Sequence, residues 1–129
     1  MNKIGAYLAA PFTHTDPMVE EWRFHRINEA AALLIRGGFD SLYSPISHTY
    51  PIDGHLAEHK ANHDFWVNKF DLPFLEHSER LLVLMLPGWL ESTGVKMEMK
   101  QAEERGISVS LVMPVYDKMF RLIGVEVNP

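Results

Sequence analysis

The fold of this chain follows from one stretch, Leu81-Leu82-Val83-Leu84-Met85-Leu86, which continues as Pro87-Gly88-Trp89-Leu90-Glu91-Ser92-Thr93-Gly94-Val95-Lys96-Met97-Glu98. Six consecutive apolar residues are typical of a strand that helices cover on both faces. Pro87 and Gly88 indicate a short loop, and a helix is expected from Thr93 to about Arg105. The stretch therefore predicts a buried strand, a loop and a helix that carries Glu98 near its beginning.

The same pattern recurs toward both ends of the chain. Strands are expected at residues 3–10, 39–43 and 107–113, the first ending at Pro11 and the last at Pro114, and the apolar tail can form one more. Asp16-Pro17 begins a long helix that Gly37-Gly38 ends. Its apolar positions at helical spacing are Val19, Trp22, Ile27, Ala30, Ala31 and Leu34. Residues 46–54 are predicted to form a loop, and residues 55–77 a helix interrupted at Pro73.

Strands that alternate with helices at this spacing imply parallel neighbours, because parallel strands need crossover connections. We therefore predict a single α/β domain over residues 1–129, with three layers (α/β/α) and a mainly parallel, flavodoxin-like sheet. Ligands of such folds bind beyond the carboxyl ends of the strands. Residues 7–13, 45–48 and 87–98 fall there.

The composition excludes several classes of function. The chain has no cysteine, which removes disulfides, thiol catalysis and cysteine-bound metals and is consistent with a cytoplasmic protein. A formal charge of -5 argues against binding to a nucleic-acid polymer or an anionic membrane surface. No apolar run approaches the roughly 20 residues that span a bilayer, and a secretory leader is not expected.

Glu98 is the strongest candidate for chemistry. It shares the edge of a helix face with Val95, Met99 and Ala102, so its carboxylate borders the buried side of the helix. A carboxylate near a helix N-terminus can stay ionised and point toward a ligand. From spacing alone, a solvated surface glutamate is the commoner explanation.

Two segments, Tyr7-Leu8-Ala9-Ala10-Pro11-Phe12 and Ser92-Thr93-Gly94-Val95-Lys96-Met97-Glu98, together resemble the nucleoside 2-deoxyribosyltransferase-like superfamily, which includes deoxynucleoside monophosphate N-glycosidases. Nearly the whole chain is similar to an uncharacterised bacterial family placed in that superfamily. The resemblance implies an enzyme that cleaves the N-glycosidic bond of a 2-deoxynucleoside or its 5'-monophosphate and needs no cofactor. Water as acceptor would make it a hydrolase, and a second base would make it a transferase.

The resemblance also implies roles for individual residues. Glu98 would be the nucleophile, Tyr7 would orient it, and Asp71 would hold or protonate the leaving base. Ser92 would contact the 5'-phosphate, and the other expected substrate-binding residues are Pro11, Phe12, His48 and Gly94. Four of these residues have a plainer alternative: a core tyrosine for Tyr7, a surface aspartate for Asp71, a helix N-cap for Ser92 and a turn histidine for His48.

Two other functions stay open. The transferases' second base-side aspartate has only Glu91 or Ser92 nearby here, which allows a nucleotide-binding module without turnover. The histidines at positions 55, 59 and 63 would share one side of a helix, where imidazoles can bind a divalent metal; a polar helix face is the rival explanation, and we expect no metal site. The resemblance further implies a homo-oligomer in which a neighbouring subunit completes the site.

Overall fold

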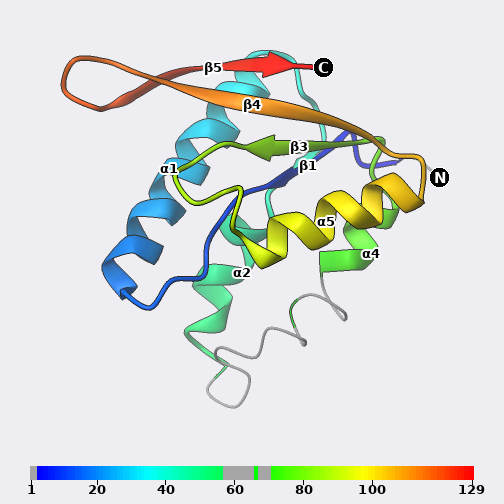
Figure 1. Cartoon of the computed structure of the whole chain (residues 1–129), viewed down its shortest axis with the longest axis horizontal. Helices are drawn as coiled ribbons and strands as arrows, with labels where there is room; N and C mark the ends of the chain where they lie inside the picture. The colour runs from blue at the N-terminus through cyan, green and yellow to red at the C-terminus, as the bar shows by residue number, and fades with distance from the viewer. Residues whose placement is uncertain (1–2, 57–65, 67–70) are drawn as a thin grey trace.

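A computed structural model describes residues 3–56, 66 and 71–129 of the protein. In these residues one sheet has the strand order β2-β1-β3-β4-β5, with β1 at Ala6–Ala9, β2 at Leu42–Tyr43, β3 at Arg80–Leu84, β4 at Ser108–Tyr116 and β5 at Leu122–Asn128. The first four strands are parallel, and β5 pairs antiparallel with β4. The helices are α1 (Pro17–Arg36), α2 (Pro45–Asp53), α4 (Leu72–Glu76) and α5 (Thr93–Glu104). The predicted three-layer α/β/α fold with a mainly parallel sheet is confirmed (Figure 1).

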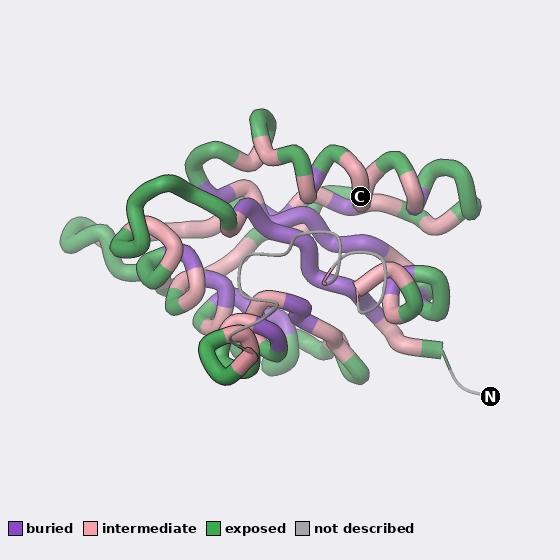
Figure 2. Tube along the Cα trace, turned by 90° about the horizontal axis from the view of Figure 1, so that it is seen from below, coloured by how far each residue is buried: buried purple, intermediate pink, exposed green. Residues whose placement is uncertain are grey.

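The central strands β1 and β3 are buried on both faces, as their apolar runs predict. Successive side chains of a strand point to opposite faces, so Leu8, Leu82 and Leu84 pack with the apolar face of α1. Tyr7 and Val83 point the other way and pack with residues of α4 and α5. Figure 2 shows the buried segments gathered in the middle of the molecule, with exposed segments on the outer sides of the helices.

Helix α1 begins and ends where the sequence predicts. The Asp16 side chain accepts a hydrogen bond from the Met18 amide at 2.9 Å, Pro17 occupies the first turn, and the helix ends at Gly37. Its buried face differs from the prediction at one position. Trp22 is 39% exposed, whereas Arg23, one residue later, is buried in line with Ile27.

Two predictions about the remaining segments were wrong. Of the predicted loop at residues 46–54, residues 46–53 lie in helix α2 and Gly54 is its C-cap; Pro45 stands in the first turn, where its missing amide is no loss. Strand β4 continues through Pro114 to Tyr116. Its pairing with β3 ends at Val112, so beyond that point β4 has a hydrogen-bonded neighbour on one side only, and an edge position of this kind tolerates proline.

The expected interruption at Pro73 lies in the first turn of the short helix α4. The rest of the predicted helix at residues 57–65 and 67–70, which includes His59 and His63, lies outside the described residues. In the part of the chain that the structure describes, no helix has the length and apolar character needed to cross a membrane.

Gly5 allows β1 to lie close to the segment that leads into β2. A Cβ atom at this position would lie 2.4 Å from the backbone oxygen of Asp40, so an added methyl group can be accommodated only if the backbone moves. We expect Gly5→Ala to lower the free energy of unfolding by about 1–3 kcal/mol, the usual cost of overpacking. Chemical denaturation measures this change.

Gly54→Ala is the matched control. The nearest atom to a Cβ at residue 54 is the Pro51 oxygen at 3.8 Å, an ordinary contact, so this variant should be neutral or slightly stabilised. Equal unfolding midpoints for both variants would show that the approach of Gly5 to Asp40 does not constrain the fold.

Candidate functional site

The Tyr7 hydroxyl donates a hydrogen bond to Glu98 Oε2, although 91 positions separate the two residues in the chain. Tyr7 lies in β1, on the face of the sheet that α5 covers. Glu98 lies in α5 one turn after buried Val95, and its side chain therefore reaches the strand from the half-buried edge of the helix. Residues of β1 and α5 thus meet in one polar contact inside an apolar layer.

Asp71 lies beside this contact, immediately before α4. Its charge raises the pKa of both Tyr7 and Glu98, and Leu72, the next residue, packs against the apolar cluster that contains Tyr7. The Asp71 Oδ1 atom is buried and has no hydrogen-bond partner among the described residues. A buried acceptor that is left unpaired costs about 1–3 kcal/mol, which is a reason to expect a ligand or an ordered water at this atom.

Burial controls the protonation of the cluster. Desolvation raises the pKa of Glu98 to about 8; the charge of Asp71 acts in the same direction, and the hydrogen bond from Tyr7 acts against both. Desolvation also raises the pKa of Asp71 to about 7. The pKa of Tyr7 is raised well above its ordinary value, first by burial and then by the neighbouring carboxylates, so its hydroxyl keeps its proton. Near neutral pH the two carboxyl groups therefore carry fewer than two negative charges.

Tyr43 belongs to the same cluster, and sequence reasoning did not select it. It is the register partner of Tyr7 on the adjacent parallel strand, and the two ring centroids lie 5.7 Å apart. Its pKa is raised by burial and by the charges of Asp71 and Glu98. A polar aromatic residue at the end of a predicted strand, just before Ser44-Pro45, was the available signal.

Arg23 is a second residue that sequence reasoning missed. The buried guanidinium donates from Nη1 to the Phe12 and Thr13 carbonyl oxygens and from Nη2 to the Pro87 oxygen, each at 3.1 Å. It therefore ties the loop after β1 to the loop after β3. Gly88 lies against it with a φ of +94°, and a Cβ there would be 2.7 Å from Nη2. A basic residue in line with the apolar face of a helix was the sequence signal.

The remaining predicted residues lie along the same edge of the sheet. Ser92 caps α5, and its Oγ accepts from the Val95 amide at 3.2 Å. Gly94 is in the first turn of α5, and the nearest atom to a Cβ there is 3.9 Å away, so packing does not require glycine at this position.

The loop after β1 is held by an aromatic contact. The Phe12 ring lies edge-on to the Tyr50 ring of α2, 5.0 Å between centroids, and the adjacent Pro11 is buried. The exposed His48 lies in α2 and not in a turn, with its ring centroid 6.0 Å from that of Tyr43.

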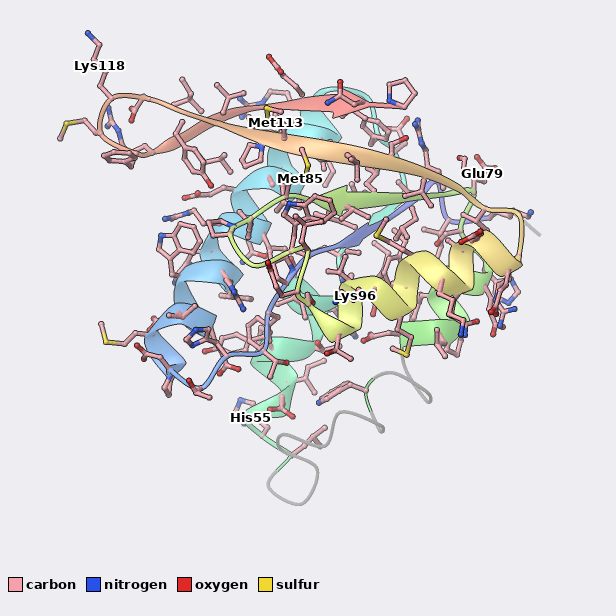
Figure 3. All side chains as sticks on the ribbon, in the orientation of Figure 1. His55, Glu79, Met85, Lys96, Met113 and Lys118 are labelled. Atoms are coloured by element: carbon pink, nitrogen blue, oxygen red, sulfur yellow. The ribbon has the colours of Figure 1, made fainter. Side chains whose placement is uncertain are left out.

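The described residues contain no group of three or more histidine, cysteine, aspartate or glutamate side chains arranged to hold a metal ion. His55 follows the C-terminal end of α2 (Figure 3), and the two other histidines of the predicted triplet, His59 and His63, lie outside the described residues. The cluster around Glu98 is thus the candidate site, and its chemistry is that of carboxyl and phenol groups.

Arg23→Met should destabilise the protein because three backbone carbonyls lose a charged donor. Each hydrogen bond to a charged group contributes about 1.5–3 kcal/mol. Because the two loops can relax after the guanidinium is removed, we expect a loss of about 2–4 kcal/mol in unfolding free energy, which is less than the sum of three such bonds. Arg26→Met is the control, because Arg26 pairs with the more exposed Glu29 on the same helix. Such pairs contribute at most about 1 kcal/mol. Losses of similar size in the two variants would contradict the proposed tie between the loops.

The raised pKa values predict how stability depends on pH. Between about pH 4.5, the ordinary pKa of a glutamate, and about pH 8, folded Glu98 keeps a proton that the unfolded chain releases. The free energy of unfolding should therefore fall as the pH rises through this range, and Glu98→Gln should flatten that fall. Denaturant midpoints at pH 5 and pH 8 measure how the free energy of unfolding changes with pH in the wild type and in Glu98→Gln.

Glu104→Gln, at an exposed position of the same helix, controls for the loss of one charge and should keep the wild-type pH dependence. A Glu98→Gln slope equal to that of wild type would exclude a buried proton at Glu98.

Comparison with known proteins identifies the family of the chain but does not assign an activity to it. Residues 5–114 match the model of a family described as a domain of unknown function, DUF1937. A search of curated proteins finds none that matches the chain. The matched region begins before β1 and ends within β4, so it contains Tyr7, Tyr43, Asp71 and Glu98. The chain therefore belongs to the DUF1937 family.

Proposed function

We propose that the protein is an N-glycosidase or deoxyribosyltransferase that cleaves the N-glycosidic bond of a 2-deoxynucleoside or its 5'-monophosphate. The observation that carries the proposal is the hydrogen bond from Tyr7 to Glu98 beside a second buried carboxyl group, Asp71. Two carboxyl groups in unlike environments are what glycosidic cleavage requires, one as nucleophile and one as acid. The resemblance of the segments around Tyr7 and Glu98 to the deoxyribosyltransferase-like superfamily supports the same assignment.

In the proposed first step a Glu98 oxygen attacks the anomeric carbon of the deoxyribosyl group as the bond from that carbon to the base nitrogen breaks. The bonding electron pair goes to the base, and protonated Asp71 donates its proton to the departing base. Tyr7 holds the attacking carboxylate in one orientation and disperses its charge. The product is a glycosyl ester of Glu98.

In the second step water, or the nitrogen of another base, attacks the anomeric carbon from the opposite face. The carbon–oxygen bond to Glu98 breaks, the Glu98 carboxylate is regenerated, and ionised Asp71 takes the proton of the attacking group. One proton shared by the two carboxyl groups is the starting state that this cycle needs. The raised pKa values of both groups support one shared proton near neutral pH; because the pKa of Glu98 is the higher of the two, this proton must move to Asp71 before Glu98 attacks.

The beginning of α5 is the proposed place for a 5'-phosphate. The amides of the first turn of a helix favour an anion, and Ser92 retains a hydroxyl proton after it accepts from Val95. The open surroundings of Gly94 are consistent with close approach of a ligand to this turn. The substrate proposed is accordingly a small molecule and not a polymer.

The proposal is tested by incubating the protein with the deoxynucleosides and their 5'-monophosphates, with and without an added acceptor base. Chromatography should detect free base or an exchanged nucleoside. Glu98→Gln should reduce release at least about 10³-fold, as expected for the loss of a nucleophile. Glu104→Gln, on the exposed side of the same helix, should retain wild-type release.

A covalent intermediate separates this mechanism from direct attack by water. Acid quenching during turnover of a 2-fluoro-2-deoxyarabinosyl substrate should leave a sugar adduct on the peptide that contains Glu98, detectable by mass spectrometry. Heat stabilisation by nucleotides without release of any base would instead favour a nucleotide-binding module and reject the enzymatic proposal.

A further inference from the structure

The Tyr43 hydroxyl is buried and has no hydrogen-bond partner among the residues that the structure describes. Its ring is held from two sides. It stacks on the Phe74 ring, with centroids 4.1 Å apart and planes 10° from parallel, and it lies against the Tyr7 ring at 5.7 Å. The hydroxyl therefore has a fixed position without a local partner that explains it.

Tyr43 stands beside Tyr7, the residue that bonds to Glu98, on one face of the sheet. Tyr7 and Tyr43 are register partners on parallel strands, so their side chains stand on the same face. Asp71 and Glu98 both act on Tyr43 electrostatically. The phenol stays neutral beside them and is thus a hydrogen-bond donor.

Among the described residues, neither Glu98 nor Asp71 accepts a hydrogen bond from the Tyr43 hydroxyl. Glu98 accepts from the Tyr7 hydroxyl, and Asp71 Oδ1 also has no partner within the described part of the chain. One cluster therefore contains an unused donor and an unused acceptor. A nucleobase edge would satisfy both, with an acceptor facing Tyr43 and, facing Asp71, a donor when this carboxyl group is ionised or an acceptor when it is protonated.

We propose that Tyr43 is a further substrate-binding residue, whose hydroxyl donates a hydrogen bond to a ring-nitrogen or carbonyl acceptor of the leaving base. The inference deepens the proposed function and rests on it for the identity of the ligand. It adds to that function a requirement on the substrate: the base must present an acceptor to Tyr43. Phe74, by stacking on Tyr43, positions this donor.

Tyr43→Phe tests the inference because it removes the hydroxyl and keeps the ring. Titration calorimetry with hypoxanthine, adenine, thymine and cytosine should show a dissociation constant about 3–10 times higher than wild type for at least one base, the effect of one neutral hydrogen bond. Indole keeps the fused-ring shape and has no ring-nitrogen or carbonyl acceptor, so its affinity should not change. The melting temperature of the free protein should stay the same or rise, because the lost hydroxyl has no partner among the described residues.

Tyr116→Phe is the matched control. The Tyr116 hydroxyl is also buried and unpaired among the described residues, but it lies at the end of β4 near Arg26 and Glu29 of α1. This variant should bind every base as wild type does. The inference is overturned if no base binds to the wild-type protein, if Tyr43→Phe leaves all affinities unchanged, or if both variants weaken binding equally.

Failure of the proposed function gives a different result. If the bases bind and Tyr43→Phe weakens their binding, while no deoxynucleoside is cleaved, Tyr43 is a base-binding residue in a protein without glycosidase activity. If bases are released and Tyr43→Phe changes neither affinity nor KM, the glycosidase proposal stands and the role of Tyr43 is rejected.

Discussion

The burial of β1 and β3 on both faces is the constraint on which the rest of the structure depends. These strands cannot be exposed on either side, so α1 must cover one face and α4 with α5 the other. The alternation of side chains then sends Leu8 toward α1 and Tyr7 toward α5. Because the crossovers bring α5 over the end of β1 and β3, the hydroxyl of Tyr7 and the carboxylate of Glu98 meet inside the layer that apolar residues form.

This arrangement places ionisable groups where ionisation is unfavourable. Glu98 and Asp71 respond by keeping their protons to higher pH, and Tyr43 and Asp71 retain polar atoms without partners in the described part of the chain. Such features reduce stability and are common where a ligand or a reacting group is to be bound. Arg23 is a contrasting case, because its buried guanidinium donates three hydrogen bonds to carbonyl groups and so joins the loops after β1 and β3.

Local sequence patterns predicted the helix caps, the end of α1 and the buried strand β3. The caps Asp16 and Ser92, the glycine pair that follows α1, and the continuous apolar run of β3 each depend on neighbours in the sequence, and the predicted elements agree with the structure there. Composition failed at residues 45–53, because proline, serine and histidine suit a loop and also suit the first turn of a helix. Pro114 was predicted to end a strand, but only the strand order shows that β4 lacks one neighbour beyond Val112. In the candidate site, Glu98 and Tyr7 stood out through a resemblance of two segments, whereas Tyr43 and Arg23 had only weak local signals, a polar aromatic residue at a strand end and a basic residue in line with an apolar helix face.

The sequence by itself determined the α/β class, the buried central strands, the capped helices and a carboxylate at the edge of the helix after β3. Those features follow from the period of apolar residues and from the conformational limits of proline and glycine, which act within a few residues of the chain. Only the tertiary structure decided that Tyr7 bonds to Glu98, that Tyr43 and Asp71 lie beside them, and that Arg23 joins two loops. Strand order and helix placement set these contacts, and both depend on how the whole chain covers two faces of one sheet.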